Sequence, residues 1–341
     1  MNPDNRLSQL NTWLGTLATK WSLDLTTIQP ASSDASFRRY FRVLGNKNGS
    51  QTSFIVMDAP PATEDTKPFI NISKLLADAK LNVPVVLEQD IEQGFLLLTD
   101  LGNQTYLSVL NQQTAPKLYQ DANNALIQMQ LASKPGLLPD YDKALLTREL
   151  ELFPEWYIGK HLQIQLDAKQ KDDLAKVFEL ILQNNLAQAK VIVHRDYHSR
   201  NLMVTDQNNP GILDFQDAVY GPITYDLASL YRDAYIEWEE PEQMDWLIRY
   251  WDKARKTGLP VQNEFGDFYR DYEWMGLQRH LKVLGIFARL YHRDGKDGYL
   301  KDIPLVFKYT RKVAERYIAL KPLVQLLDSI EGIQRPDGLT F

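Results

Sequence analysis

The stretch Val193–Asn201 reads VHRDYHSRN, and the stretch Gly211–Ala218 that follows it reads GILDFQDA. The chain has only five histidines in 341 residues, and two of them flank Asp196 in the first stretch. Asn201 closes that stretch, and Asp214 follows apolar residues in the second. Any interpretation of function has to explain why these three polar residues occur together.

The three residues fit the needs of phosphoryl transfer. In that reaction a carboxylate orients the attacking hydroxyl, and Mg²⁺ ions held by oxygen ligands neutralise the phosphates. We predict that Asp196 is the catalytic base and that Asn201 and Asp214 hold the metal. Either metal residue alone would most often close a turn. The combination His-x-Asp-x-x-x-x-Asn, followed by two apolar residues and Asp-Phe, is far more specific. The intervening LMVTDQNNPGI can form a strand, a turn and a strand, which would return Asp214 to Asn201.

Composition excludes several classes of function. Hydrophobic residues make up 44% and charged residues 24% of the chain, as in an ordinary globular protein. The net charge of −6 and the lack of a basic block give no reason to expect a nucleic-acid partner. Without cysteine there is no disulfide framework, thiolate metal site or cysteine nucleophile. No secretory leader or membrane-spanning run is recognisable, so we predict a cytoplasmic protein with no membrane partner.

The pattern of apolar residues changes near Gly102. Before it, an amphipathic helix over 4–19 and a helix over 66–80 accompany short β-prone runs at 37–44, 52–58, 84–88 and 95–100. After it, helical spacing dominates, at 106–132, 145–162, 167–189, 225–238, 241–256, 265–291 and 304–318, with strand-like pieces only near 201–204 and 211–215. We predict an α+β, two-lobed, protein-kinase-like fold, in which residues 1–101 form a small antiparallel-sheet lobe that binds nucleotide and residues 102–341 form a mainly helical catalytic and substrate lobe.

Longer stretches extend the match. VHRDYHSRNLMV, GILDFQDAVYGPITYDLASLYRDAY and LQRHLKVLGIFARLYHRDGKDGYLKDIP resemble the aminoglycoside phosphotransferase branch of the protein-kinase-like superfamily. Within it they resemble bacterial kinases of cell-wall recycling that phosphorylate N-acetylmuramate and N-acetylglucosamine at the anomeric carbon. The resemblance implies ATP as donor, Mg²⁺ as cofactor, and the roles already given to Asp196, Asn201 and Asp214. It also implies a hinge at Thr99, Asp100 and Leu101, whose backbone would face adenine.

The small lobe departs from the pattern of protein kinases, which use a glycine-rich loop and a lysine–glutamate pair. The loop candidate PASSDASFRRY, 30–40, has no glycine, the strand FIVMD has no lysine, and the helix over 66–80 has no glutamate. Either another cation reaches the phosphates or the protein binds nucleotide without transferring phosphate. For the first case we predict that Ser33, Ser36 and Arg39 bind nucleotide, with Ser32, Arg38 and Arg42 as further candidates. The alternative to nucleotide binding is that these arginines lie on a solvent-exposed face of a strand.

The acceptor end of the site is less defined. His198 and Asp217 follow the predicted base and metal ligand and would face an acceptor, although His198 can instead tie the loop to nearby backbone. Arg279 and Lys282, three positions apart on one helix, make a candidate surface for the carboxylate of N-acetylmuramate. The alternative is that these two are the solvated side of a helix with an apolar stripe.

The sequence therefore predicts a monomeric ATP-dependent sugar kinase whose partners are ATP and an amino sugar. Two alternatives stay open: a kinase of the same fold acting on an aminoglycoside or an amino alcohol, and a nucleotide-binding module without catalysis.

Overall fold

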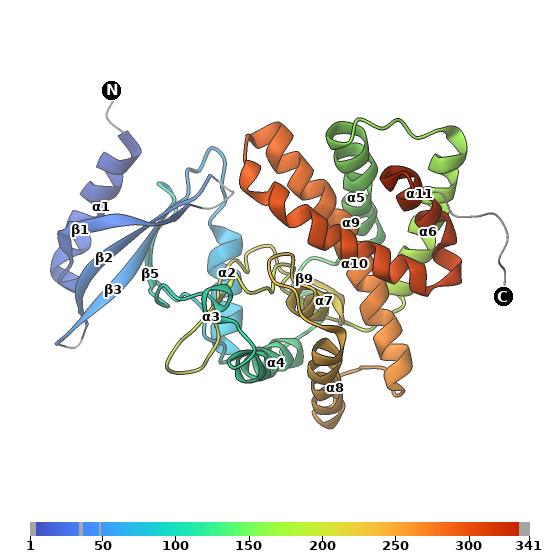
Figure 1. Cartoon of the computed structure of the whole chain (residues 1–341). Coiled ribbons are helices and arrows are strands. Elements are labelled where there is room, and N and C mark those ends of the chain that lie inside the picture. Colours follow the sequence, from blue (N-terminus) through green and yellow to red (C-terminus); the bar gives the residue numbers. More distant parts are fainter. Residues whose placement is uncertain (1–4, 34–36, 48, 334–341) are drawn as a thin grey trace. The chain divides into compact units, whose positions relative to one another are not determined.

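The computed structural model describes residues 5–33, 37–47 and 49–333. The chain divides into two compact units (Figure 1). The first unit contains residues 1–109 and 200–217, and the second contains residues 110–199 and 218–341. In the described part of the chain, no helix combines the length and apolarity that crossing a bilayer requires.

The first unit is built on a five-stranded antiparallel sheet with the strand order β1-β2-β3-β5-β4. The strands are β1 (Asp24–Ser33), β2 (Arg39–Lys47), β3 (Ser50–Asp58), β4 (Val86–Asp90) and β5 (Phe95–Thr99). β2 and β3 pair without interruption from Arg39 opposite Asp58 to Lys47 opposite Ser50. The predicted small antiparallel sheet is confirmed, but β1 was missed and covers the first part of the stretch interpreted as a loop.

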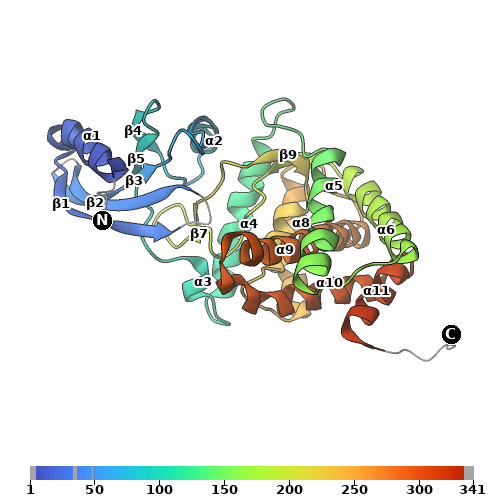
Figure 2. The same cartoon turned by 90° about the horizontal axis from the view of Figure 1, so that it is seen from above.

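Two helices flank this sheet. α1 (Asn5–Trp21) contacts β1 and β2 and buries Leu10 and Leu14 against Val43, Val56 and Phe95 (Figures 1 and 2). The alternation of apolar residues along β2 and β3 supplies the facing surface, because side chains two apart in a strand share one side. α2 (Lys67–Asp78) confirms the second predicted helix, and its first turn contains Pro68, where the missing N–H of proline costs no helical hydrogen bond.

The segment 200–217 forms the predicted strand–turn–strand. β7 (Leu202–Met203) pairs with β8 (Gly211–Ile212) in an antiparallel hairpin. Gly211 lies close to Leu101, since a Cβ added at Gly211 would be 2.9 Å from Cδ1 of Leu101. The main chain therefore approaches the predicted hinge closely.

The second unit is mainly helical, and the long helix α9 (Phe265–Asp294) runs through it with α5, η1, α7 and α10 against it (Figures 1 and 2). Its other elements are α4 (Ala115–Leu131), α5 (Lys143–Leu152), the π-helix η1 (Phe153–His161), α6 (Ala168–Leu186), α7 (Tyr225–Tyr231), α8 (Glu240–Lys256), η2 (Asp297–Asp302), α10 (Ile303–Arg316), η3 (Ile318–Leu320) and α11 (Lys321–Glu331). The two-lobed α+β fold class is confirmed.

Several predicted helices end earlier than apolar spacing indicated. The helix over 106–132 is divided into α3 (Tyr106–Val109) and α4, because Asn111 accepts hydrogen bonds from the backbone of Gln113 and Thr114 and Pro116 follows. The helix over 145–162 changes from α to π at Phe153, next to Pro154. α7 ends at Tyr231 instead of Trp238.

Two strands and one helix were also missed. β6 (Lys190–Val193) pairs with β9 (Val219–Pro222), so strand structure in the second half is not confined to the motif segments. α11 follows the last helix that the sequence predicted. The predicted division into lobes of residues 1–101 and 102–341 stays a prediction.

Candidate active site

The two predicted metal ligands lie side by side in the first unit. Nδ2 of Asn201 lies 3.3 Å from Oδ2 of Asp214, and the backbone N–H of Leu213 donates to the carbonyl oxygen of Asn201 at 2.9 Å. Gln216 donates to the other oxygen of Asp214 at 2.8 Å. Asn201 and Asp214 are both half-buried. The β7–β8 hairpin therefore brings together the two side chains, as the sequence predicted.

Asp214 has a left-handed backbone conformation, with φ of +61°. Few residues other than glycine adopt it, and strained positions of this kind cluster at functional sites. The donor set fits Mg²⁺, which commonly takes one or two protein oxygens and completes its shell with water and phosphate. No group of three or more histidine, cysteine, aspartate or glutamate side chains that could hold a metal occurs among the described residues.

The predicted base lies in the second unit, on a loop fixed by a buried carboxylate. The backbone N–H groups of His194 and Arg195 donate to Asp226, at 2.7 and 3.0 Å. Burial raises the pKa of Asp226 to about 7, against the opposing effect of these two hydrogen bonds. Arg195 has φ of +78°, so the chain turns sharply just before Asp196. Asp226 was not singled out in the sequence, where nothing distinguishes it from other helical aspartates.

Basic side chains lower the pKa of Asp196. Burial by itself would raise the pKa of its carboxyl, but the charges of Lys282 and Arg279, together with the neighbouring His198 and His194, outweigh burial, so the pKa lies below its ordinary value. This balance keeps Asp196 ionised and able to accept a hydrogen bond from a hydroxyl.

One of these cations belongs to a buried cluster that we call the Glu149 cluster, made of Glu149, Lys282, Arg195 and Tyr141. Oε1 of Glu149 lies 3.0 Å from Nζ of Lys282 and 2.5 Å from Nη2 of Arg195, and the Tyr141 hydroxyl donates to Oε2. Lys282 also donates to the Tyr225 hydroxyl at 3.0 Å. Burial opposes ionisation of Glu149, yet the two cations and the hydroxyl hold its pKa below the ordinary value. The cluster connects the predicted base loop to α5 and α9.

The two basic residues on α9 are therefore not a solvated face. Lys282 is 6% exposed and Arg279 is 3% exposed. Nη1 of Arg279 is buried without a hydrogen-bond partner among the residues that the structure describes. The interpretation of these residues as the wet side of an amphipathic helix is wrong, because α9 is packed on most of its circumference.

The remaining predicted acceptor residues differ in accessibility. His198 is 8% exposed, and its ring packs edge-on against Tyr235 with 5.4 Å between centroids. The next residue, Ser199, donates from both its backbone and its hydroxyl to Asp233, which was missed in the sequence. Asp217 is exposed. His198 thus belongs to the tightly held part of the loop.

In the predicted phosphate-binding stretch, Ser33 ends β1 and Ser36 lies outside the described residues. Arg39 lies opposite Asp58 on the neighbouring strand and donates to it from Nε at 3.0 Å and Nη2 at 2.5 Å. Arg38 lies 3.5 Å from Glu64. Arg42 lies 2.5 Å from Asp100, so Arg38, Arg39 and Arg42 each have a carboxylate partner.

The predicted hinge is fixed to the sheet by side chains. The carboxylate of Asp100 binds Arg42 and accepts the backbone N–H of Gly102 at 2.9 Å. The hydroxyl of Thr99 accepts the N–H of Val85 at 2.9 Å. The backbone N–H of Thr99 also donates to the carbonyl oxygen of Val85 at 3.0 Å. The contact of residues 99–101 with adenine stays a prediction.

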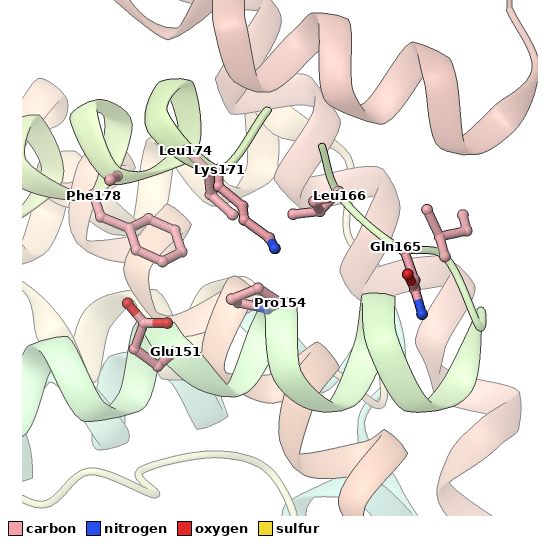
Figure 3. Close-up of a pocket in the computed structure, with 9 residues that line it drawn as sticks. Glu151, Pro154, Gln165, Leu166, Lys171, Leu174 and Phe178 are labelled. Atoms are coloured by element: carbon pink, nitrogen blue, oxygen red, sulfur yellow. The ribbon is translucent and has the colours of Figure 1, made fainter. Parts of the chain in front are cut away.

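A pocket of about 400 Å³ opens in the second unit between η1 and α6 (Figure 3). Apolar side chains including Pro154, Leu166 and Phe178 line it, and Glu151 and Lys171 point into it from opposite sides. None of the predicted site residues lines this pocket. We therefore assign it no part in the predicted chemistry.

The small antiparallel-sheet unit, the helical unit and the His-Arg-Asp loop together define a kinase-like phosphotransferase. The chain belongs to the phosphotransferase enzyme family, whose model matches residues 27–263. It is 48% identical over 337 residues to the N-acetylmuramate/N-acetylglucosamine kinase of Pseudomonas aeruginosa, covering 97% of this chain and 98% of that protein. It is also 48% identical over 341 residues to the protein of the same name from Neisseria meningitidis serogroup B, covering 98% and 99%.

Among solved structures, the gentamicin-APH(2")-IIa complex has the same fold, with a TM-score of 0.59, 17% identity, and coverage of 87% of this chain and 95% of that one. The resemblance that the sequence motifs indicated is confirmed.

Proposed function

We propose that the protein transfers the γ-phosphoryl group of ATP to the anomeric hydroxyl of N-acetylmuramate and N-acetylglucosamine, in peptidoglycan recycling. The observation that carries the proposal is the near full-length identity of 48% to two kinases named for these sugars. The chain also contains Asp196, Asn201 and Asp214, the residue types that phosphoryl transfer needs, at the expected spacing.

In the proposed mechanism Asp196 accepts a hydrogen bond from the sugar hydroxyl, orients it for in-line attack and takes its proton. The low pKa of Asp196 supports this role, because the base has to be ionised before the hydroxyl can donate to it. An anomeric hydroxyl is more acidic than an ordinary alcohol, so a weak base suffices. Asn201 and Asp214 would hold Mg²⁺, which supplies positive charge to the ATP phosphates when bound.

For the nucleotide we propose contacts from Ser33, Ser36 and Arg39 to the phosphates and from the backbone of Thr99, Asp100 and Leu101 to adenine. Arg39 is supported by its place at the start of β2, next to the serine-rich stretch.

For the acceptor we propose His198, Asp217, Arg279 and Lys282. Arg279 is the better candidate for the lactyl carboxylate, because its buried Nη1 lacks a partner among the described residues, whereas Lys282 is bonded to Glu149 and Tyr225. A buried guanidinium with an unused donor gains from binding a carboxylate. We propose further that the protein acts as a monomer in the cytoplasm, where ATP is supplied, with no nucleic-acid or membrane partner.

Phosphorus NMR of the protein with ATP, Mg²⁺ and each sugar tests the function. We expect a sugar 1-phosphate resonance coupled to the anomeric proton, and no such resonance from Asp196→Asn, which should still fold and bind ATP. A resonance at another hydroxyl would remove the anomeric assignment. Silence with both sugars but product from an aminoglycoside or an amino alcohol would favour a different acceptor. Silence with every acceptor, together with ATP binding, would leave a nucleotide-binding module.

A further inference from the structure

The buried carboxylate of Asp58 is shared between two arginines from distant parts of the first unit. Asp58 is the last residue of β3 and is 0% exposed. Its Oδ2 accepts the two hydrogen bonds from Arg39 described above. Its Oδ1 accepts from Nη2 of Arg6, in α1. Each oxygen thus serves one guanidinium.

Arg6 is held by two further contacts. Its Nη2 donates to the carbonyl oxygen of Gln93 at 2.9 Å, and its guanidinium lies over the ring of Phe95 at 4.6 Å from the centroid. An arginine fixed on a carboxylate, a carbonyl and an aromatic ring has little freedom left. In the structure Arg6 occupies Oδ1 of Asp58, and both hydrogen bonds from Arg39 to Asp58 end on Oδ2.

This arrangement matters because the strand FIVMD has no lysine and the helix over 66–80 has no glutamate, the positions where protein kinases have their ion pair. We propose that Asp58 and Arg6 are positioning residues for nucleotide binding: Asp58 orients Arg39, and Arg6 prevents Asp58 from neutralising it. This inference rests on the proposed function of Arg39 as the cation for the ATP phosphates. It assigns part of the nucleotide site to α1, which lies outside the segment that matches the family model.

A buried carboxylate such as that of Asp58 has to be compensated by charges or hydrogen bonds. With Arg6 in place, the three side chains carry a net charge of +1. Without Arg6, Oδ1 would lose its charged donor inside the unit, and the carboxylate would turn to bind Arg39 with both oxygens. The pair would then carry no net charge, and the guanidinium would be drawn onto the sheet. Affinity for a polyanion should fall, whereas affinity for an uncharged nucleoside should not.

The test is equilibrium binding of Mg-ATP and of adenosine, measured by calorimetry on the full chain. We expect Arg6→Gln to weaken ATP binding about tenfold, as for the loss of one charge-assisted contact, and to change adenosine binding less than about twofold. Arg6→Lys, which keeps the charge, should recover part of the ATP affinity. Arg39→Ala should weaken ATP binding at least as much, and Arg6→Gln added to it should have little further effect.

Lys20→Met is the matched control. Lys20 lies on the same helix and is ion-paired with Glu88 on β4, so its loss also removes a contact between α1 and the sheet. It should change the affinity of neither ligand. Thermal unfolding of each variant establishes that binding is measured on folded protein.

Equal weakening of ATP and adenosine by Arg6→Gln would reduce Arg6 to a purely structural role and overturn the inference, as would unchanged ATP binding. Unchanged ATP affinity in Arg39→Ala would overturn it as well. These measurements need no acceptor, so they are separate from the proposed sugar kinase activity, which fails only if no sugar phosphate is formed.

Discussion

Replacing Lys282 by methionine should destabilise the protein and shift its pH dependence, because this one ammonium group serves both the Glu149 cluster and Asp196. Methionine keeps most of the buried volume of the lysine stem, so the change removes charge and hydrogen bonds with little cavity formation. It leaves Glu149 with Arg195 and Tyr141 as partners.

The magnitude follows from the geometry. A unit charge pair separated by 3.0 Å, the distance from Nζ of Lys282 to Oε1 of Glu149, attracts by about 5.5 kcal/mol at an effective dielectric constant of ~20. Removing the ammonium also removes its desolvation cost, and Arg195 continues to compensate the carboxylate. We therefore expect a loss of about 3 kcal/mol in the free energy of unfolding, at the lower end for a broken buried pair.

Urea unfolding at neutral pH measures this loss, with Lys176→Met as the control. Nζ of Lys176 lies 2.6 Å from Asp172 on an exposed face of α6, which is closer than the buried pair. Solvent screens that interaction, so the control should unfold at the same urea concentration as the unchanged protein. Equal effects of the two substitutions would refute the claim that burial makes the Lys282 pair strong.

The same variant tests the electrostatics of the base. Lys282 is the largest of the charges that lower the pKa of Asp196, so its removal should raise that pKa. The acid limb of the turnover rate against pH should then move to higher pH. An unmoved acid limb in a folded variant would mean that Lys282 does not act on the base.

Three further predictions concern Gly285, Glu149 and Asn201. Gly285→Ala should cost about 2 kcal/mol in urea unfolding, because its Cβ would lie 2.4 Å from the backbone carbonyl of Leu152, whereas Gly298→Ala, with nothing within 4 Å of the added Cβ, should cost far less. The pKa of Glu149 is lower in the folded protein than in the unfolded chain, so ionised Glu149 contributes fully to the free energy of unfolding above roughly pH 4.3. That contribution is lost as the pH falls through the folded-state pKa. In urea unfolding at a series of pH values, Glu149→Gln should show a smaller loss of unfolding free energy toward acid pH. Asn201→Ala should raise the Mg²⁺ concentration needed for half-maximal turnover about tenfold, and an unchanged requirement in a magnesium titration would remove Asn201 as a ligand.

The parts of the site that the sequence predicted are those that depend on short separations along the chain. Asn201 and Asp214 are joined by one hairpin, whose strand residues and turn residues are visible in the letters themselves. The alternation along β2 and β3 likewise predicts a sheet without knowledge of the rest of the chain.

Long-range pairing was not predictable. Nothing near Lys282 in the sequence indicates Glu149, and nothing near Asp58 indicates Arg6. Apolar periodicity shows which side of a helix is buried only when the other side is exposed to solvent, and α9 is buried on most sides. The basic residues of α9 were therefore open to two interpretations until their partners were located.

The interruption of the predicted helix over 106–132 was also not predictable from apolar spacing. Asn111 ends a helical pattern through its own side chain, and the choice between a turn and a continued helix depends on local hydrogen bonds that apolar spacing does not record. β6 and β9 are four residues each, too short for alternation to distinguish them from buried helix or loop.

Two carboxylates on and beside the base loop have opposite pKa shifts, and this difference supports the assignment of the base. Asp226 is compensated by backbone N–H groups, which carry no net charge, so burial dominates and raises its pKa to about 7. Asp196 is compensated by whole charges, which outweigh burial and lower its pKa. A base that binds a hydroxyl has to be ionised and directed at it, whereas a carboxylate that holds a loop needs only its acceptors. The opposite shifts are those expected of a reacting carboxylate and of one that positions it, and they support the proposal of Asp196 as the base.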